Sequence, residues 1–275
     1  MINRNSILMH LPVRVSAIGV GALLYAEVAG AALIDRGNGL IYDSTSGLTW
    51  LQDGNTFASQ LAADPNLASK IVNALPVDSS GNHFVSDAPN GDDTPPNSGV
   101  RNVTSTDFLT SGATGLMSWW GAKAWVNYLN SIDYKGSHQW SLPTTDGCVQ
   151  YNCTNSQWGQ LYYSALGNVA YPAQGYGLSH VGPFNNLQTY AYYWLDGQYA
   201  SNPNSAWAFD AKDGFQGVGL KIWFGYAEAV DLTAVPEPGR MGLLALGLGV
   251  LALMLRKRSL DTSVLRRNRR LAFGS

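Results

Sequence analysis

An uninterrupted apolar segment near the C-terminus limits what this chain can fold into. It covers residues 241–255 and is followed at once by the basic run Arg256-Lys257-Arg258. No polar face appears in it, so it does not suit an amphipathic helix packed on a soluble core. Fifteen helical residues extend about 22 Å, less than the roughly 30 Å hydrocarbon core, so a span also needs flanking residues or local thinning. The pattern predicts a C-terminal transmembrane helix whose basic end stays in the cytoplasm.

The N-terminal segment, residues 1–32, has the composition of a secretory signal peptide. Sparse basic residues precede an apolar run at 15–26, and small residues at 29–32 end the segment. An N-terminal membrane anchor is less favoured because the apolar run is short. We therefore expect export through the Sec machinery, which leaves one domain at 33–234 between two processing segments.

Charge is distributed unevenly between the expected domain and the two ends. Between residues 33 and 235 there are seven basic and sixteen acidic residues, a net charge of −9, whereas the other ten basic residues lie in the tails. A domain this acidic, with no basic stripe, repels phosphate backbones. We therefore exclude nucleic acid as a partner.

The two cysteines, Cys148 and Cys153, enclose only four residues. In an exported protein this spacing favours a local disulfide that closes one small loop. A redox or metal-binding pair is the alternative, but the two-residue spacing and a neighbouring histidine are missing.

The expected domain begins with strands and continues into helices. Residues 33–51 alternate and turn as a β-hairpin does, with turns at 37–39 and 43–47. Residues 56–75 are helical in composition but interrupted by Asp64-Pro65, which suits the start of a second helix. Residues 78–115 are rich in Pro, Gly, Asn and Asp and predict a long loop or insertion.

Two further helices and three aromatic strands complete the predicted pattern. Ser118 is the expected cap of a helix with an apolar face, listed as Ala122, Trp125, Val126, Leu129 and Ile132. Ser156 opens another, closed by Gly167, with an inward face of Leu161, Tyr162, Ala165 and Leu166. Strands are expected near residues 190–195, 205–209 and 220–226. This order predicts an α+β fold with helices packed on small antiparallel sheets.

The C-terminal residues, taken in order, resemble a known sorting signal. Pro236, Glu237 and Pro238 come first, then the apolar segment, then Arg256, Lys257 and Arg258. This order is similar to the PEP-CTERM signal over residues 235–258. The resemblance implies processing by an exosortase-type enzyme at the inner membrane of a Gram-negative bacterium that makes exopolysaccharide. One departure is the extension at 259–275, rich in arginine, which we interpret as a basic cytoplasmic tail.

The middle of the chain resembles a second family. The segments 45–50, 120–125, 140–144, 182–188 and 205–209 are similar to the Lcl C-terminal-like domain, a domain of unknown function common in PEP-CTERM proteins. The resemblance implies a fold akin to C-type lectins and formylglycine-generating enzymes, without a shared activity. Two departures each remove an arginine: Ser141 in the Trp-Arg-Leu-Pro motif, and the ending Glu228-Ala229-Val230-Asp231.

No pattern in the domain predicts a catalytic centre. His83, His138 and His180 are isolated in sequence, and nucleophile-elbow, phosphate-loop and zinc motifs are missing. Distant carboxylates can still pair, so a secreted enzyme acting on matrix glycans stays open as the alternative. We expect no cofactor and favour a non-enzymatic protein.

Aromatic residues suggest a binding role instead, because sugar faces stack on indole and phenol rings. Trp125 and Trp158 fit core positions, whereas Trp194, Trp207 and Trp223 lie near strand ends and are the candidate glycan-binding residues.

A candidate calcium loop also occurs, at Asp87, Asp92 and Asp93, but an ordinary solvated turn is the favoured interpretation.

Together these patterns predict an exported cell-surface or extracellular-matrix protein. It would pass through an inner-membrane-anchored intermediate before reaching the cell envelope or the extracellular matrix, where it would hold exopolysaccharide.

Overall fold

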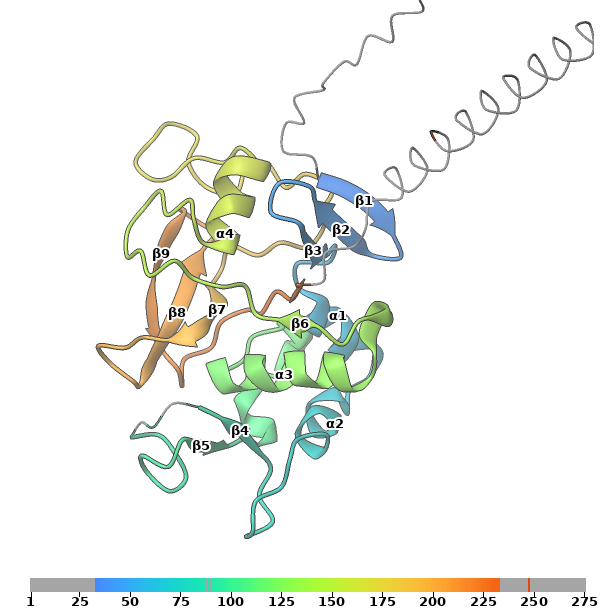
Figure 1. Cartoon of the computed structure of the whole chain (residues 1–275), viewed down its shortest axis with the longest axis vertical. Helices are drawn as coiled ribbons and strands as arrows, with labels where there is room; N and C mark the ends of the chain where they lie inside the picture. The colour runs from blue at the N-terminus through green and yellow to red at the C-terminus, as the bar shows by residue number, and fades with distance from the viewer. Residues whose placement is uncertain (1–32, 88, 90, 233–246, 248–275) are drawn as a thin grey trace, which may run out of the picture. The chain divides into compact units, whose positions relative to one another are not determined.

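The computed structural model describes residues 33–87, 89, 91–232 and 247, and these form a mixed fold of helices and small antiparallel sheets (Figure 1). The predicted α+β class is therefore confirmed. The predicted signal peptide at 1–32, the tail at 259–275 and all of 235–258 except Gly247 lie outside the described residues. Within the described part of the chain, no helix has the length and apolar character needed to cross a membrane.

The N-terminal strands form the predicted hairpin and extend it by one strand. β1 (Leu33–Gly37) pairs antiparallel with β2 (Leu40–Asp43), which pairs antiparallel with β3 (Leu48–Leu51). Both turns lie where the sequence placed them. In the second, the Asp43 side chain accepts hydrogen bonds from the Thr45 N–H and the Ser46 hydroxyl, and Gly47 adopts the positive φ that an L side chain resists.

Residues from the far end of the domain complete this sheet. β10 (Val230–Asp231) lies between β3 and β6 (Trp140–Ser141), which gives the strand order β1-β2-β3-β10-β6. Val230 is opposite Trp50 on one side and Ser141 on the other. The last described strand therefore joins the first strands of the domain to its middle.

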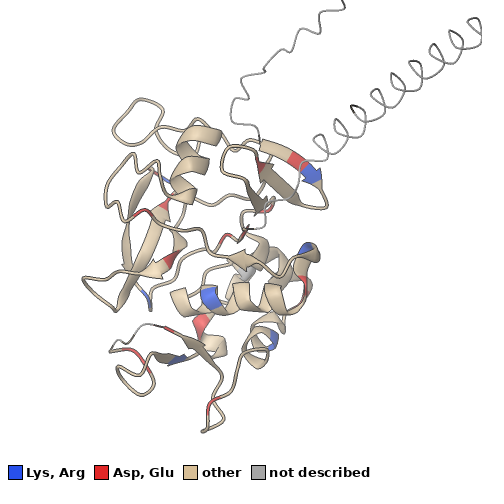
Figure 2. Cartoon of the chain, in the orientation of Figure 1, with Lys and Arg blue, Asp and Glu red and all other residues tan. Residues whose placement is uncertain are grey.

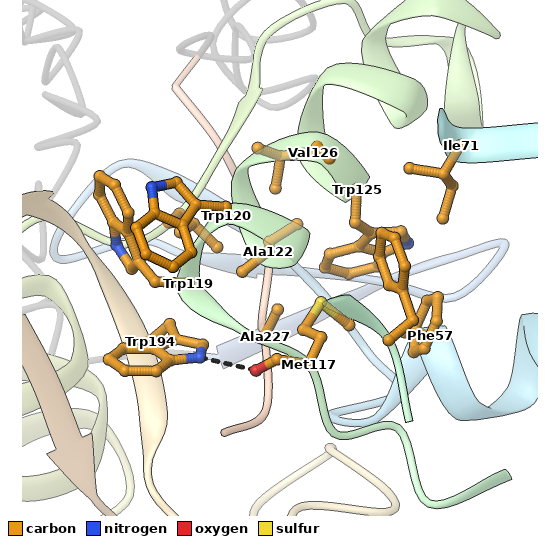
Figure 3. Packing of buried hydrophobic residues seen from close by; sticks show 14 of the residues in the cluster. Phe57, Ile71, Met117, Trp119, Trp120, Ala122, Trp125, Val126, Trp194 and Ala227 are labelled. Atoms are coloured by element: carbon orange, nitrogen blue, oxygen red, sulfur yellow. Dashed lines mark hydrogen bonds between the residues drawn. The ribbon is translucent and has the colours of Figure 1, made fainter. Parts of the chain in front are cut away.

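The helices follow the predicted boundaries closely. α1 (Thr56–Ala63) and α2 (Leu67–Asn73) are separated at Asp64, as expected. α3 (Trp119–Ser131) begins at Ser118, whose hydroxyl accepts from the Gly121 N–H at 3.1 Å. The predicted inward face of α3 is buried except for Ile132, which is exposed because the helix has already ended there. Figure 3 shows this face packed against α2 and α1 residues such as Ile71 and Phe57.

The helix predicted at Ser156 has an unusual second half. α4 (Gln157–Gly159) is capped by the Ser156 hydroxyl and continues directly into a π-helix, η4 (Gln160–Ala165), which ends before Gly167. Gly159 is required at this entry, since a Cβ there would meet the Cys153 carbonyl oxygen.

Residues 78–115, predicted as a loop or insertion, contain regular structure. β4 (Phe84–Ser86) pairs antiparallel with β5 (Val100–Asn102). Two 3₁₀ turns follow, η1 (Ser105–Asp107) and η2 (Ser111–Ala113), and η3 (Tyr134–Gly136) comes later in the chain, after α3. Val85, Val103 and Phe108 of this segment are buried in the core. The sequence did not indicate this burial because apolar residues are few and widely spaced in the segment.

The C-terminal half forms a three-stranded antiparallel sheet. β7 (Tyr193–Gln198) and β8 (Ser205–Asp210) match two predicted strands, but the third, β9, is Phe215–Leu220 rather than 220–226. The sequence misplaced it because a tight turn, closed by the Gly214 N–H on the Asp210 carbonyl at 2.8 Å, starts β9 early. Residues 221–225 lie beyond β9, and Tyr226 then forms a parallel bridge with Tyr193 of β7.

Two clusters of buried side chains hold these elements together. The first centres on α3 with Trp119, Trp120 and Trp125. In the second, Trp158 stacks on Phe209 at 5.5 Å between ring centroids and meets Trp50 edge-on at 5.9 Å. The predicted core roles of Trp125 and Trp158 are confirmed.

Glu228, just before β10, is a buried carboxyl group between these clusters. Both side-chain oxygens lack a hydrogen-bond partner among the described residues, and burial raises the pKa of Glu228 well above its usual range. The nearby Asp53 carboxylate raises this pKa further. Burial therefore favours the neutral, protonated form of Glu228 in the folded protein.

Replacing Glu228 with glutamine tests this protonation. The unfolded carboxyl ionises near pH 4.5, so the stability contributed by the neutral group is complete below that pH and is lost as the pH rises toward the folded pKa. We expect Glu228→Gln to be more stable than the wild type at pH 8 by about 1–3 kcal/mol and equally stable at pH 4. Urea unfolding at both pH values measures this. A difference between the two proteins that does not change with pH would contradict it.

Candidate functional site

Two of the three tryptophans predicted to bind glycan are core residues. Trp194 is fully buried and donates its indole N–H to the Met117 carbonyl oxygen at 2.9 Å (Figure 3). Trp207 is also buried, with its ring against Tyr199. Position near a strand end did not predict exposure, because both rings project from sheet strands into the packed clusters. Trp223 differs: it lies beyond β9 and is 52% exposed.

Single alanine variants of Trp207 and Trp223 should differ in stability, because only Trp207 is buried. Because Trp207 fills the core, we expect Trp207→Ala to lower the free energy of unfolding by about 3–5 kcal/mol. Trp223→Ala should change it by no more than about 0.5 kcal/mol. Chemical denaturation of both variants measures this, and similar losses in the two would contradict these assignments.

The aspartates of the candidate calcium loop face a buried lysine. The Asp87 carboxylate contacts Lys221 Nζ at 2.5 Å and accepts the Trp120 indole N–H at 3.0 Å. Lys221 also donates to the Gln198 side chain at 3.1 Å and lies over the Trp119 ring. Asp92 and Asp93 are close enough to favour the charged form of this lysine. A calcium ion at Asp87 would therefore compete with an internal cation.

Lys221 is held charged against the cost of burial. Desolvation lowers its pKa, and the Asp87 carboxylate opposes that shift. Since both side chains are almost completely buried, the pair ties the β4–β5 insertion to the end of β9 and has the character of a structural ion pair.

Metal-ligating residue types converge at one place among the described residues, and it is not the aspartate loop. Asp146 lies beside Cys148 and Cys153. The two cysteines form the predicted disulfide, with Cα atoms 5.8 Å apart, so their sulfur atoms are not available as thiolates. The disulfide prediction is confirmed, and this group of residues does not form a metal centre.

The disulfide loop carries one ring of an exposed aromatic group that we call the aromatic patch, defined as Tyr151, Tyr171, Tyr176 and Phe215. Ring centroids are 5.1 Å apart for Tyr151 and Phe215, 5.9 Å for Tyr151 and Tyr171, and 5.2 Å for Tyr171 and Tyr176. Tyr171 is 49%, Tyr176 46% and Phe215 36% exposed. Four rings from three separate segments therefore form one continuous series on the surface.

Buried polar contacts fix the disulfide loop beneath these rings. The fully buried Gln216 side chain donates to the Cys148 carbonyl oxygen and to the Asp146 carboxylate, both at 2.8 Å. Its backbone N–H donates to the Gln150 carbonyl oxygen at 3.1 Å. The loop is thus held on β9, close to Phe215.

Asp213 links the remaining segments of the patch. Its backbone carbonyl accepts from the Tyr171 N–H at 3.0 Å, and its carboxylate accepts from the Tyr151 hydroxyl at 3.4 Å. Desolvation and the Asp213 carboxylate raise the pKa of Tyr151, so its hydroxyl stays protonated at neutral pH. The patch offers apolar ring faces together with hydroxyl groups and one carboxylate.

Charged residues are sparse over the described fold, and the basic ones lie on separate elements, such as Lys70 in α2, Arg101 in β5 and Lys123 in α3 (Figure 2). The three histidines of the domain, His83, His138 and His180, lie in separate segments. Each forms a hydrogen bond with a residue close to it in sequence; His138 Nδ1, for example, lies 2.9 Å from the Asn130 carbonyl oxygen. The aromatic patch is therefore the surface feature with the clearest binding chemistry.

The sequence did not indicate this patch, because its rings are spread from residue 151 to residue 215 and lie in loops or at a strand start. The available signal was the density of tyrosine beside Gly, Asn and Pro. No family model, no curated protein and no solved structure matches this chain.

Proposed function

We propose that this chain is an exported cell-surface or matrix protein of a Gram-negative bacterium, sorted by an exosortase-type enzyme. The order of Pro236-Glu237-Pro238, the apolar segment and Arg256-Lys257-Arg258, behind a signal-peptide-like start, supports this. The confirmed disulfide suits an oxidising compartment outside the cytoplasm. The resemblance to the Lcl C-terminal-like domain makes a lectin-like variant of the α+β fold part of the same proposal.

The domain itself, in this proposal, holds exopolysaccharide on the aromatic patch. The observation that carries it is the series of contacting rings, three of them more than one-third exposed. Exposed aromatic faces are uncommon on a protein surface unless something covers them, and the apolar face of a pyranose ring is a suitable partner. Tyrosine hydroxyls and the Asp213 carboxylate can then bind the equatorial hydroxyl groups.

Polymer retention tests the binding role. We expect Tyr171→Ala combined with Tyr176→Ala to reduce retention on insoluble exopolysaccharide on the order of tenfold, since each lost ring contact contributes about 0.5–1.5 kcal/mol. Phe215→Ala should also weaken retention, because Phe215 belongs to the patch. Its matched control is Phe224→Ala, which should leave retention unchanged, since the two rings have nearly equal exposure, 36% and 37%. Pull-down with the same polymer measures retention.

Equal retention of the double variant and the wild type would contradict the role of the patch. The alternative function is a secreted enzyme acting on matrix glycans, and the same polymer can be assayed for it. Release of reducing ends from the polymer by the wild type would replace the binding proposal with the enzymatic one.

Processing of the C-terminus tests the sorting proposal independently. We expect mass spectrometry to find the chain cleaved near Pro236-Glu237-Pro238 in a strain with an exosortase, and intact through the basic residues of 259–275 in a strain without it. An intact basic end in both strains would contradict exosortase processing.

A further inference from the structure

An uncharged pocket beside α1 shares no residue with the aromatic patch. It has a volume of about 500 Å³, which is within the range of small-ligand sites. The amide side chains of Asn55, Asn186 and Gln188 line it together with the rings of Tyr190 and Tyr226. None of its lining residues is charged.

The Asp53 carboxylate fixes several residues that line this pocket. Its carboxylate accepts hydrogen bonds from the Asn55 backbone N–H at 3.0 Å, the Asn186 side chain at 2.9 Å and the Ser59 hydroxyl at 2.5 Å. The Gln188 side chain in turn donates to the Asn186 carbonyl oxygen at 2.7 Å. The amide groups are therefore held in place before any ligand arrives, which lowers the entropic cost of binding.

A second set of contacts fixes the Asn55 side chain. The Asn55 side chain donates to the Thr114 carbonyl oxygen at 3.1 Å. Gly115, at a φ of +80°, leaves room for this contact, because a Cβ there would lie 1.9 Å from Asn55 Oδ1. The connection before α1 is thus joined to the segment that precedes α3.

Hydrogen-bonding groups remain available to a ligand at the rim. The Gln188 side-chain oxygen and the Tyr190 hydroxyl have no hydrogen-bond partner among the described residues, and Tyr190 is 85% exposed. The lining also has an apolar part, to which Ala58, Ala62 and Leu116 contribute, so the pocket offers apolar contact beside its amide groups.

We propose that this pocket binds one or two units of a neutral sugar, a hexose or an N-acetylhexosamine. Amide groups donate to and accept from sugar hydroxyls, and the exposed Tyr190 ring can stack on a pyranose face. The uncharged lining has no cation to pair with a uronic acid, and the Asp53 carboxylate, which is bonded to the lining residue Asn186, disfavours one. Soluble sugar binding at this pocket is independent of polymer retention at the aromatic patch.

Calorimetric titration with three disaccharides tests the proposal: diacetylchitobiose, cellobiose and digalacturonic acid. We expect at least one of the two neutral sugars to bind and the acidic one to bind at least tenfold more weakly. Gln188→Ala and Tyr190→Ala should each weaken the neutral sugar about fivefold or more. Ala62→Trp, which fills the pocket from the exposed side of α1, should abolish binding.

Phe224→Ala is the control, since Phe224 belongs to neither site. Thermal melts confirm that each variant is folded; Tyr190 is mostly exposed, so its truncation leaves the core intact. No heat of binding with either neutral sugar, or digalacturonic acid bound as tightly as they are, would overturn the proposal. If no disaccharide binds but the polymer is still retained, the pocket proposal is wrong and the proposed role of the aromatic patch is unaffected.

Discussion

The burial of indole rings together with their N–H groups is the constraint on which the rest of this structure depends. A buried indole contributes a large apolar area, and an internal acceptor for its N–H adds a hydrogen bond. The buried Trp50 and Trp158 N–H groups have no such acceptor among the described residues, whereas other indoles do. Here Trp119 donates to the Leu195 carbonyl oxygen and Trp194 to the Met117 carbonyl oxygen, while Trp125 donates to the Gln60 side chain. Each bond joins segments far apart in sequence. Ring burial therefore also fixes how α3, α1 and β7 are arranged.

The same constraint decides which aromatic residues remain for ligands. The other eight tryptophans are buried in the core, and Trp223 is the one tryptophan that is exposed. Tyrosines in loops remain at the surface, since their hydroxyl groups need no internal acceptor there. The aromatic patch rests on the disulfide loop and on β9, whereas the pocket beside α1 rests on Asp53. Separate polar contacts therefore hold two surfaces with different chemistry, one of ring faces and one of amides.

Buried ionisable groups tie the remaining parts to this core. Lys221 and Asp87 neutralise each other between the β4–β5 insertion and the end of β9. Glu228, beside β10, has no cationic partner of this kind among the described residues, and its burial favours the neutral form of the carboxyl group. Removing one member of such an ion pair leaves an uncompensated charge, so the insertion is an integral part of the domain rather than a detachable loop.

Local chemistry in the sequence was sufficient to determine the turns at 37–39 and 43–47, the break at Asp64, the caps Ser118 and Ser156, and the disulfide. Each depends on residues within a few positions of one another, so spacing alone specifies it. Only the tertiary structure decided which rings were buried and what faced Asp87. Those outcomes depend on partners more than thirty residues away, such as Lys221 for Asp87 and Met117 for Trp194. A single sequence carries the propensity of each segment, but the packing that selects among these partners exists only in the folded chain.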